Sequence, residues 1–193
     1  MFELNDRVIV LTGSTGVLGG SIAKSLAKEK SIVIVLGRNE ALLKSLTLEL
    51  NVFSESNYFV VDVLSKEALI KVKEKIIQKW GRVDALINAV GGNLPGAVVG
   101  EDQSLFDLAE DDFDEVVDLN LKGTLLPSLV FGEVMKDQGK GSIVNYSSMA
   151  VDRTITRVAG YSASKAAMEN FTRWMAVEMA LRYGDGVRVN AIA

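Results

Sequence analysis

Short apolar runs alternate with segments of helical length along the chain, and this alternation limits the possible folds more than any other feature. The runs are typical of buried β-strands and cover residues 7–12, 31–36, 58–61, 85–89, 142–146 and 187–193. The segments between them predict five helices: 17–30, a second that follows the strand 31–36 and ends near residue 50, 66–80, 112–137 and 161–183. Ser65 should cap the third helix, and Gly123 and Pro127 should bend the fourth. Strands that are apolar on both faces and joined by helices predict a parallel sheet with helices on both sides.

The composition suits one soluble domain and excludes several partners. The chain has 193 residues, 48% of them apolar and 24% charged, which is enough to bury a sizeable core. A net charge of -4 argues against nucleic acid or an anionic membrane as a partner. No apolar run approaches the roughly 18 residues of a membrane span, and residues 2–6 lack the cationic start of a secretory signal. The absence of cysteine fits a cytoplasmic protein.

Histidine is absent as well as cysteine. The chain therefore cannot form an ordinary zinc site, a thiolate nucleophile or a histidine-centred acid–base pair, and we predict no metal. Proton transfer near neutral pH would fall to a tyrosine, lysine, aspartate or glutamate in a perturbed environment.

Tyr161 and Lys165 are the strongest candidates for that transfer. They lie in the segment Tyr-Ser-Ala-Ser-Lys at the start of the last predicted helix. Side chains four residues apart share one face of a helix, so the phenol and the ammonium can act in one site. A cation about 4 Å away favours a phenolate by about 1 to 4 kcal/mol. Because such pairs also occur by chance, their assignment depends on the rest of the chain.

A glycine-rich turn, Thr-Gly-Ser-Thr-Gly-Val-Leu-Gly at residues 12–19, follows the first predicted strand. Glycines allow the backbone to approach a pyrophosphate, and the start of the next helix offers unpaired N–H groups to it. A tight strand–helix connection would also explain the glycines. The position of the turn, opening the first unit of a repeating β–α pattern, favours dinucleotide binding.

Three further motifs accompany the turn and the tyrosine–lysine pair. They are Asn-Ala-Val-Gly at 88–91, Asn120 within Leu-Asn-Leu-Lys-Gly, and Ser148 before Tyr161. Together, in this order and over nearly the whole chain, the motifs resemble the short-chain dehydrogenase/reductase family. The resemblance implies an α/β fold of Rossmann type, a doubly wound parallel sheet in three layers with strand order 3-2-1-4-5-6. It also implies one NAD(P)-binding domain over residues 1–193.

The resemblance assigns the catalytic roles to Asn120, Ser148, Tyr161 and Lys165. Tyr161 would exchange a proton with the oxygen of a secondary alcohol or ketone while a hydride passes to or from the nicotinamide. Lys165 would favour ionisation of the tyrosine and bond the nicotinamide ribose. Ser148 would hold the substrate oxygen, and Asn120 would anchor a water in the proton path. Taken singly, each could instead be an ordinary structural residue.

The resemblance also implies the cofactor contacts. They are Gly13, Ser14, Thr15, Gly16, Val17, Leu18, Gly19, Arg38, Asn39, Asp62, Val63, Asn88, Ala89, Gly91, Tyr161 and Lys165, with Asn88 mainly bracing the sheet. Val17 occupies the usual place of the middle glycine, which should shift the path near the phosphates without abolishing the site. An acid after the second strand would bond a ribose hydroxyl of NAD, whereas Arg38 can accommodate a 2′-phosphate. Unless Arg38 is only a solvated turn residue, this favours NADP(H) over NAD(H).

The substrate is predicted from the loop after the fourth strand, residues 91 to about 110, which is long for a β–α connection. With residues 119–127 and 147–149, this loop resembles the D-mannonate oxidoreductase/fructuronate reductase branch of the family. A sugar acid carries a carboxylate, for which Arg157 is the first candidate and Arg153 the second, with Asn93 and Ser148 as further contacts. Arg157 could equally be a surface or subunit-contact residue. A reductase for a neutral sugar, steroid or acyl-carrier ketone, or a non-catalytic cofactor sensor, are the alternatives.

The last predicted strand, residues 187–193, matches the one that in this family precedes a Pro-Gly, a substrate lid, further helices and a final strand. We therefore expect a trimmed chain that lacks the lid and the family's last strand. We also expect the full-length protein to form a homo-oligomer, a tetramer or a dimer.

Overall fold

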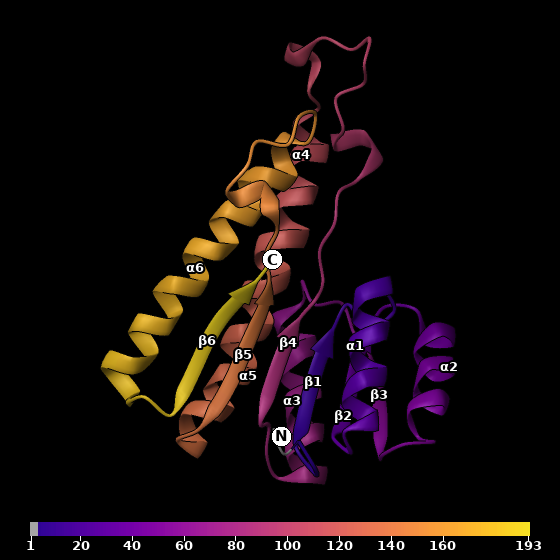
Figure 1. The fold of residues 1–193 in the computed structure, drawn as a ribbon, viewed down its shortest axis with the longest axis vertical. Helices are drawn as coiled ribbons and strands as arrows, with labels where there is room; N and C mark the ends of the chain where they lie inside the picture. Colours follow the sequence, from indigo (N-terminus) through magenta and orange to yellow (C-terminus); the bar gives the residue numbers. More distant parts are fainter. Residues whose placement is uncertain (1–3) are drawn as a thin grey trace.

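The computed structural model of the protein describes residues 4–193 and contains a central sheet of six parallel strands (Figure 1). The strands are β1 (Val8–Thr12), β2 (Ile32–Gly37), β3 (Ser56–Val60), β4 (Ala85–Asn88), β5 (Gly141–Tyr146) and β6 (Val187–Ile192). Their order is β3-β2-β1-β4-β5-β6, and each neighbouring pair is parallel. This confirms the predicted Rossmann-type α/β fold and its strand order.

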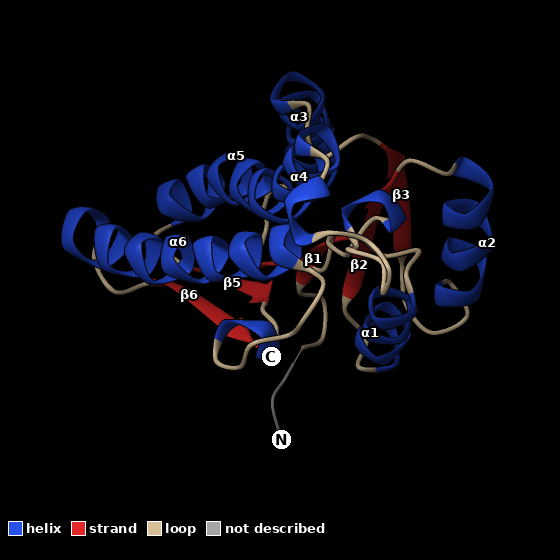
Figure 2. Cartoon of the chain, turned by 90° about the horizontal axis from the view of Figure 1, so that it is seen from above, coloured by secondary structure: helices blue, strands red, loops and turns tan. Residues whose placement is uncertain are grey.

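The helices form a layer on each side of the sheet (Figure 2). One layer consists of α1 (Val17–Lys28) and α2 (Glu40–Leu50). The other consists of α3 (Lys66–Trp80), α5 (Gly123–Gln138) and α6 (Ala159–Tyr183). The short helix α4 (Glu110–Val117) packs against α6 beyond the end of the sheet.

Alternation along the strands explains why the central ones read as continuous apolar runs. Successive side chains of a strand point to opposite faces of the sheet. In β2, Val33 and Val35 enter the core under α1 and α2, whereas Ile34 and Leu36 enter the core under α3 and α5. Both faces are therefore buried, and each such side chain contributes about 1.5 to 3 kcal/mol through the hydrophobic effect.

Most element boundaries lie within two residues of the predicted ones. The helix over 66–80 is confirmed, and Ser65 caps it by accepting a hydrogen bond from the Ala68 N–H at 3.3 Å. The third strand begins at Ser56 and ends at Val60, slightly before its predicted range.

The region over 112–137 is helical, but its interruption differs from the prediction. A π-helical turn, Asp118–Lys122, joins α4 to α5, and the Gly123 N–H bonds the Asp118 carbonyl five residues earlier. Pro127 lies inside α5 rather than at the interruption. The interruption is thus one widened turn that ends where Gly123 begins α5, and the bends at Gly123 and Pro127 stay a prediction.

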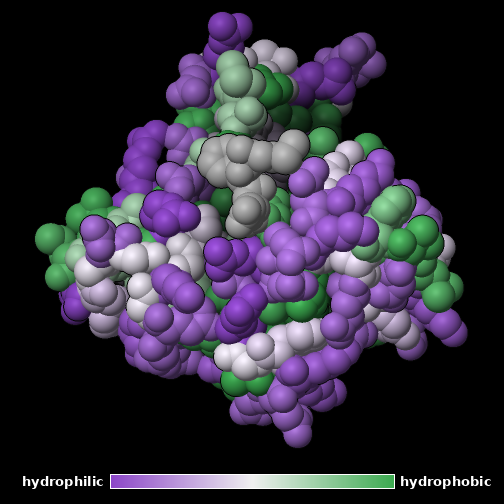
Figure 3. All heavy atoms as spheres, turned by 60° about the horizontal axis from the view of Figure 1, so that its bottom comes forward, coloured by the Kyte–Doolittle hydropathy of each residue, from purple (hydrophilic) through white to green (hydrophobic). Residues whose placement is uncertain are grey.

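The segment between β4 and α4 projects beyond the carboxyl ends of the strands (Figure 1). We call residues 93–109 the arm; it contains two short 3-10 helices, Pro95–Ala97 and Leu105–Asp107. The opposite side, seen in Figure 3, is mostly hydrophilic, with smaller hydrophobic patches. Within the described residues, no helix is long and apolar enough to cross a membrane.

Candidate active site

The predicted site residues follow strand ends that meet at one edge of the sheet. The glycine-rich turn follows β1, Arg38 follows β2, residues 89–91 follow β4 and Ser148 follows β5. Carboxyl ends of parallel strands form the usual ligand-binding edge of open α/β sheets. The chain therefore gathers these segments in space although they are far apart in sequence.

The glycine-rich turn is packed too closely for side chains at two positions. Gly13 has a φ of 65°, and a β-carbon there would lie 2.5 Å from the carbonyl of Ala89 after β4. A β-carbon at Gly19 would lie 2.2 Å from the Gly13 carbonyl oxygen. Only glycine fits at both positions, so the turn lies directly against the end of β4.

The start of α1 suits an anion. The helix follows Gly16, and within residues 4–193 no side chain caps this end and its first turn carries no acid. The N–H groups of the first turn can therefore bind a phosphate. The Val17 side chain is 92% exposed, so a branched residue at this position does not close the turn. Ser14 is buried, and its hydroxyl donates to the Leu36 carbonyl at 3.2 Å.

A cavity of about 260 Å³ lies beside this turn. It brings together many of the residues predicted to contact the cofactor, namely Gly13, Thr15, Gly16, Arg38, Asp62, Val63, Ala89 and Gly91. Sequence reasoning missed Gly37, Val61, Leu64, Val90 and Leu119, which line the same cavity and are each close in sequence to a predicted residue. Leu119 lies in the π-helical turn, whereas the other four end or follow β2, β3 or β4, and that position was the available signal.

Other predicted cofactor residues have structural partners outside this cavity. Leu18 lies in the first turn of α1 and is largely exposed. Asn39 caps α2 by accepting from the Leu42 N–H at 3.1 Å. Asn88 is buried and donates to both Ser128 Oγ and Asn145 Oδ1 at 2.9 Å, which ties β4 to α5 and β5.

Lys165 is buried close to Tyr161. Its side chain projects from α6, the whole residue is 4% exposed, and Nζ donates to the Tyr146 carbonyl at 2.7 Å. Nζ also lies 5.8 Å from the centroid of the Tyr161 ring. Burial lowers the pKa of Lys165 to about 8 because a charged ammonium is poorly solvated there.

Asn120 is buried in the π-helical turn and bonds the backbone of Gly92, which lies between β4 and the arm. Its Nδ2 donates to the carbonyls of Gly92 and Val116 at 2.8 Å, and its Oδ1 accepts from the Gly92 N–H at 3.0 Å. A β-carbon at Gly91 would lie 2.6 Å from Asn120 Oδ1 and 3.0 Å from Lys165 Nζ. Gly91 thus belongs both to the cavity beside α1 and to the surroundings of Lys165 and Asn120.

Ser148 follows the end of β5 and caps the 3-10 helix Met149–Val151. Its Oγ accepts a hydrogen bond from the Ala150 N–H at 3.1 Å. This contact uses an oxygen lone pair and leaves the hydroxyl hydrogen free to be donated. The same 3-10 helix packs against α6, which carries Tyr161 and Lys165.

A second cavity, of about 540 Å³, lies between the arm and the segment that joins Ser148 to Tyr161. Arg157 lines it but is engaged with the arm, since Nε donates to the Val99 carbonyl at 2.7 Å and Nη1 pairs with Glu101 at 3.1 Å. Its φ of 71° is unusual for a residue with a side chain, and its carbonyl accepts from the Val99 N–H at 2.9 Å. Arg153 lines the same cavity and forms no ion pair within residues 4–193.

Asn93, also predicted to contact the substrate, lines neither of these two cavities. Its Oδ1 is buried and has no hydrogen-bond partner among the residues that the structure describes. Asn93 and Arg157 therefore do not line a common cavity among these two.

The family model for short chain dehydrogenases matches residues 7–193. The chain belongs to this family. Its fold, the relatives described below and the matched region agree that it is an NAD(P)-dependent oxidoreductase acting on CH–OH groups.

Proteins similar to this chain match nearly all of its length. An uncharacterized oxidoreductase, UxuB, of Bacillus subtilis (strain 168) is 38% identical over 99% of this chain and 71% of its own length. A candidate D-mannonate oxidoreductase from Haemophilus influenza, solved with bound NAD, has a TM-score of 0.91 and 34% identity over 99% of this chain and 71% of its own. An actinorhodin polyketide ketoreductase variant, solved with NADPH, has a TM-score of 0.86 and 30% identity over 99% and 70%.

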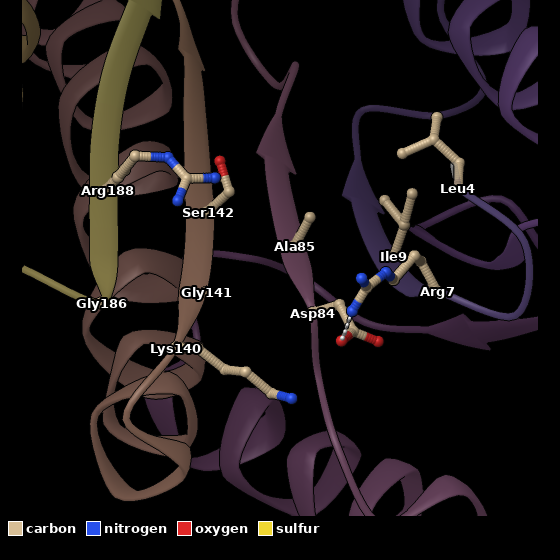
Figure 4. A pocket seen from close by; sticks show the side chains of 10 residues that line it. All are labelled: Leu4, Arg7, Ile9, Asp84, Ala85, Lys140, Gly141, Ser142, Gly186 and Arg188. Carbon is tan, nitrogen blue, oxygen red and sulfur yellow. Dashed lines mark hydrogen bonds and ion pairs between the residues drawn. The ribbon is translucent and has the colours of Figure 1, made fainter. Parts of the chain in front are cut away.

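A third cavity of the dehydrogenase, about 360 Å³, lies at the opposite edge, where the strands begin (Figure 4). Its charged side chains include Arg7 and Asp84, which pair at 3.2 Å, together with Lys140 and Arg188. Asp84 also accepts from the Val8 N–H at 2.8 Å, so it holds strand starts together. None of the predicted catalytic or cofactor residues lines this cavity, and the described residues contain no group of metal-binding side chains.

Proposed function

We propose that the protein interconverts a secondary alcohol and a ketone, with Tyr161 as the acid–base group and Asn120, Ser148 and Lys165 as its partners. The observation that carries this proposal is the shared position of Gly91. Gly91 lines the cavity beside the start of α1 and the glycine-rich turn, both of which suit a dinucleotide. It also lies beside Lys165 and Asn120. A cofactor in that cavity would extend toward the tyrosine–lysine pair.

In ketone reduction, a bound nicotinamide cofactor would be the source of the hydride that the carbonyl carbon receives. Tyr161 gives its hydroxyl proton to the carbonyl oxygen, which completes the alcohol. Ser148 donates a hydrogen bond to the same oxygen. Its Oγ accepts from the Ala150 N–H through a lone pair, so its hydroxyl hydrogen is free for this bond. Lys165 stabilises the negative charge left on the tyrosine oxygen, and Asn120 anchors the water through which a proton returns. Alcohol oxidation uses the same residues in reverse.

The decisive test is Tyr161→Phe, which removes only the hydroxyl. We expect turnover to fall by roughly 1,000-fold, since general acid–base catalysis contributes about 100- to 10,000-fold. Cofactor affinity, measured by quenching of tryptophan fluorescence, should stay within about threefold of wild type. Turnover close to wild type in this variant would refute the assignment of Tyr161. Cofactor binding without turnover in the wild type would favour the non-catalytic cofactor sensor.

We further propose NADP(H) as the preferred cofactor, with NAD(H) as the alternative. Arg38 lines the cavity at the end of β2, where a 2′-phosphate would lie, and residues 37–39 contain no acid. Arg38→Ala should reduce kcat/KM for NADPH by about tenfold or more and leave that for NADH nearly unchanged. A wild-type preference for NADH by an order of magnitude would reverse this choice.

A sugar acid of the mannonate/fructuronate type is the proposed substrate. Its support is the similarity to the Haemophilus protein together with a cation, Arg153, on the cavity between the arm and the Ser148–Tyr161 segment. Arg157, the first sequence candidate, is engaged with Val99 and Glu101. We therefore assign the substrate carboxylate to Arg153 and the fastening of the arm to Arg157.

Two arginine variants separate these roles. Arg153→Ala should raise KM for fructuronate by about tenfold or more while leaving KM for a neutral ketone unchanged. Arg157→Ala should raise KM for both substrates, because the arm loses its attachment. Equal effects of Arg153→Ala on acid and neutral substrates would exclude the carboxylate contact. Higher kcat/KM for neutral ketones in the wild type would favour the second candidate function, which the similarity to a polyketide ketoreductase supports.

A homo-oligomer, a dimer or a tetramer, is proposed from the outer faces of α5 and α6. Leu129, Trp174, Val177 and Leu181 expose large apolar surfaces there. Exposed apolar patches of this kind are typical of interfaces. Light scattering coupled to gel filtration should show an oligomer for wild type and dissociation for Leu181→Glu; a wild-type monomer at micromolar concentration would contradict the proposal.

A further inference from the structure

The end of β5 is fastened to α6 by two adjacent bonds. The Tyr146 carbonyl accepts from Lys165 Nζ at 2.7 Å, and the hydroxyl of the next residue, Ser147, donates to Glu169 Oε2 at 2.5 Å. Lys165 and Glu169 are four residues apart, so they lie on one face of α6 and meet the strand end together. Of these two bonds, only the first belongs to the catalytic group described above.

Glu169 is an unusual choice for a purely packing position. Its side chain is 17% exposed, and its second carboxylate oxygen pairs with the exposed Arg173 one turn later. A carboxylate removed from water needs partners, and a hydrogen bond to a charged acceptor is stronger than one between neutral groups. The Ser147–Glu169 bond is therefore a firm attachment rather than an incidental contact.

Further along the strand, a third bond continues the attachment. Asn145 Nδ2 donates to Thr172 Oγ1 at 2.9 Å. Ser147 directly follows β5, and its hydroxyl and the Asn145 amide both bond side chains of α6. Of these three bonds to α6, the Ser147–Glu169 bond is the nearest in sequence to Ser148.

We propose that Glu169 is a positioning residue that, through Ser147, fixes Ser148 relative to Tyr161 and Lys165. The proposal rests on the function proposed above, in which Ser148 and Tyr161 hold the same substrate oxygen. Ser148 is one peptide bond beyond Ser147, so a shift of Ser147 moves Ser148 by a similar amount. A misplacement of about 1 Å in such a site can reduce rate by about 100-fold.

A bond that only stabilised the fold would behave differently from a positioning bond. Its loss would lower the melting temperature and leave kcat of the folded enzyme unchanged. Loss of positioning lowers kcat in protein that is fully folded and still binds cofactor. Neither Ser147 nor Glu169 lines the cavity beside the glycine-rich turn, which makes NADPH affinity an internal control.

The experiment compares Glu169→Ala, Ser147→Ala and the double variant in the enzyme, using NADPH and the best ketone substrate. We expect each single change to lower kcat by about tenfold or more, with NADPH affinity within about twofold of wild type. The double variant should be no slower than the slower single variant, because both changes break one bond. Glu169→Gln keeps an acceptor oxygen for Ser147 and should restore kcat to within about threefold.

Arg173→Ala is the matched control, since it removes the ion pair at the other oxygen and leaves the Ser147 bond in place; it should keep wild-type kcat. Unchanged kcat in folded Ser147→Ala, or equal losses in Glu169→Gln and Glu169→Ala, would overturn the proposal. If Glu169→Ala does not fold, Ser147→Ala carries the test. Tyr161→Phe is assayed in parallel: an inactive Tyr161→Phe with active Ser147→Ala refutes only the positioning role, whereas an active Tyr161→Phe refutes the proposed function itself.

Discussion

Replacing Lys165 by methionine should change stability in a way that depends on pH. The folded pKa of Lys165 is about 8, against 10.5 for the free side chain, because the ammonium is buried. Each pKa unit corresponds to about 1.36 kcal/mol, so holding the charged lysine in the folded state costs about 3 kcal/mol at neutral pH. Methionine has a similar length and carries no charge, so the variant does not bear this cost.

The sign of the pH effect follows from the lowered pKa. Between about pH 8 and 10.5 the unfolded chain binds more protons at this lysine than the folded one does. The free energy of unfolding of the wild type therefore rises with pH in this window, and the contribution of Lys165 is least favourable below pH 8. From pH 7 to pH 9.5, the two pKa values give the wild type about 2 kcal/mol of additional stability from this group.

The variant also loses the bond from Nζ to the Tyr146 carbonyl. An unsatisfied carbonyl costs about 1 to 3 kcal/mol, which offsets much of the gain, so the stability difference at one pH is not diagnostic. The change in that difference is diagnostic. Lys165→Met, compared with wild type, should become less stable by about 2 kcal/mol on going from pH 7 to pH 9.5.

Urea unfolding followed by tryptophan fluorescence measures this at the two pH values. Lys71→Met, at an exposed position on α3, is the matched control for loss of a lysine in general and should show no such dependence. If the stability difference between Lys165→Met and wild type is the same at both pH values, Lys165 is not desolvated and the reasoning is refuted.

Three further predictions follow from contacts in the site. Gly91→Ala should reduce turnover, measured by initial rates, at least tenfold more than Gly92→Ala. Both positions have φ near 155°, but only a β-carbon at position 91 would meet Asn120 and Lys165. Equal losses in the two variants would contradict this contact. NADPH affinity, measured by calorimetry, should fall as pH rises through about 8 in wild type and not in Lys165→Met, because the deprotonated lysine no longer attracts the anionic cofactor. Asn88→Ala should lower the free energy of unfolding by about 2 to 4 kcal/mol in urea titrations, since it leaves buried polar partners unpaired; a change below 1 kcal/mol would show that the network relaxes.

The sheet could be predicted because its information is local. The central apolar runs lie in strands buried on both faces, as β2 shows with Val33 to Leu36. The helices between the strands fix parallel pairing and a right-handed crossover. The helix over 66–80 was equally readable, since its start has a serine cap and its end, at Gly81, has the left-handed backbone typical of a glycine stop.

The site was less predictable because it depends on contacts between distant segments. Nothing near Arg157 in sequence indicates that its guanidinium fastens the arm at Val99 and Glu101, which are more than fifty residues away. Leu119 likewise lines the cavity from the π-helical turn, although the rest of the lining comes from the glycine-rich turn and from the ends of β2, β3 and β4. The side-chain types identified the candidate site residues, whereas contacts in the fold decide which of them, unlike Arg157, have no competing partner.

The π-helical turn shows how a local irregularity serves this distant site. Such a turn moves the backbone donors from the carbonyl four residues back to the one five residues back, as the Gly123 N–H bond to Asp118 illustrates. Side chains bond two carbonyls in this region: Asn120 Nδ2 donates to Val116, and Thr124 Oγ1 donates to the Asn120 carbonyl at 3.1 Å. Asn120 is thereby held from both directions along the helix while its remaining amide contacts reach Gly92. An uninterrupted α-helix would rotate later residues by about 100° relative to this arrangement, because one residue fewer would fill the turn. The widened turn lets one continuous helical segment support the core through α5 and hold the backbone beside Lys165 through Asn120.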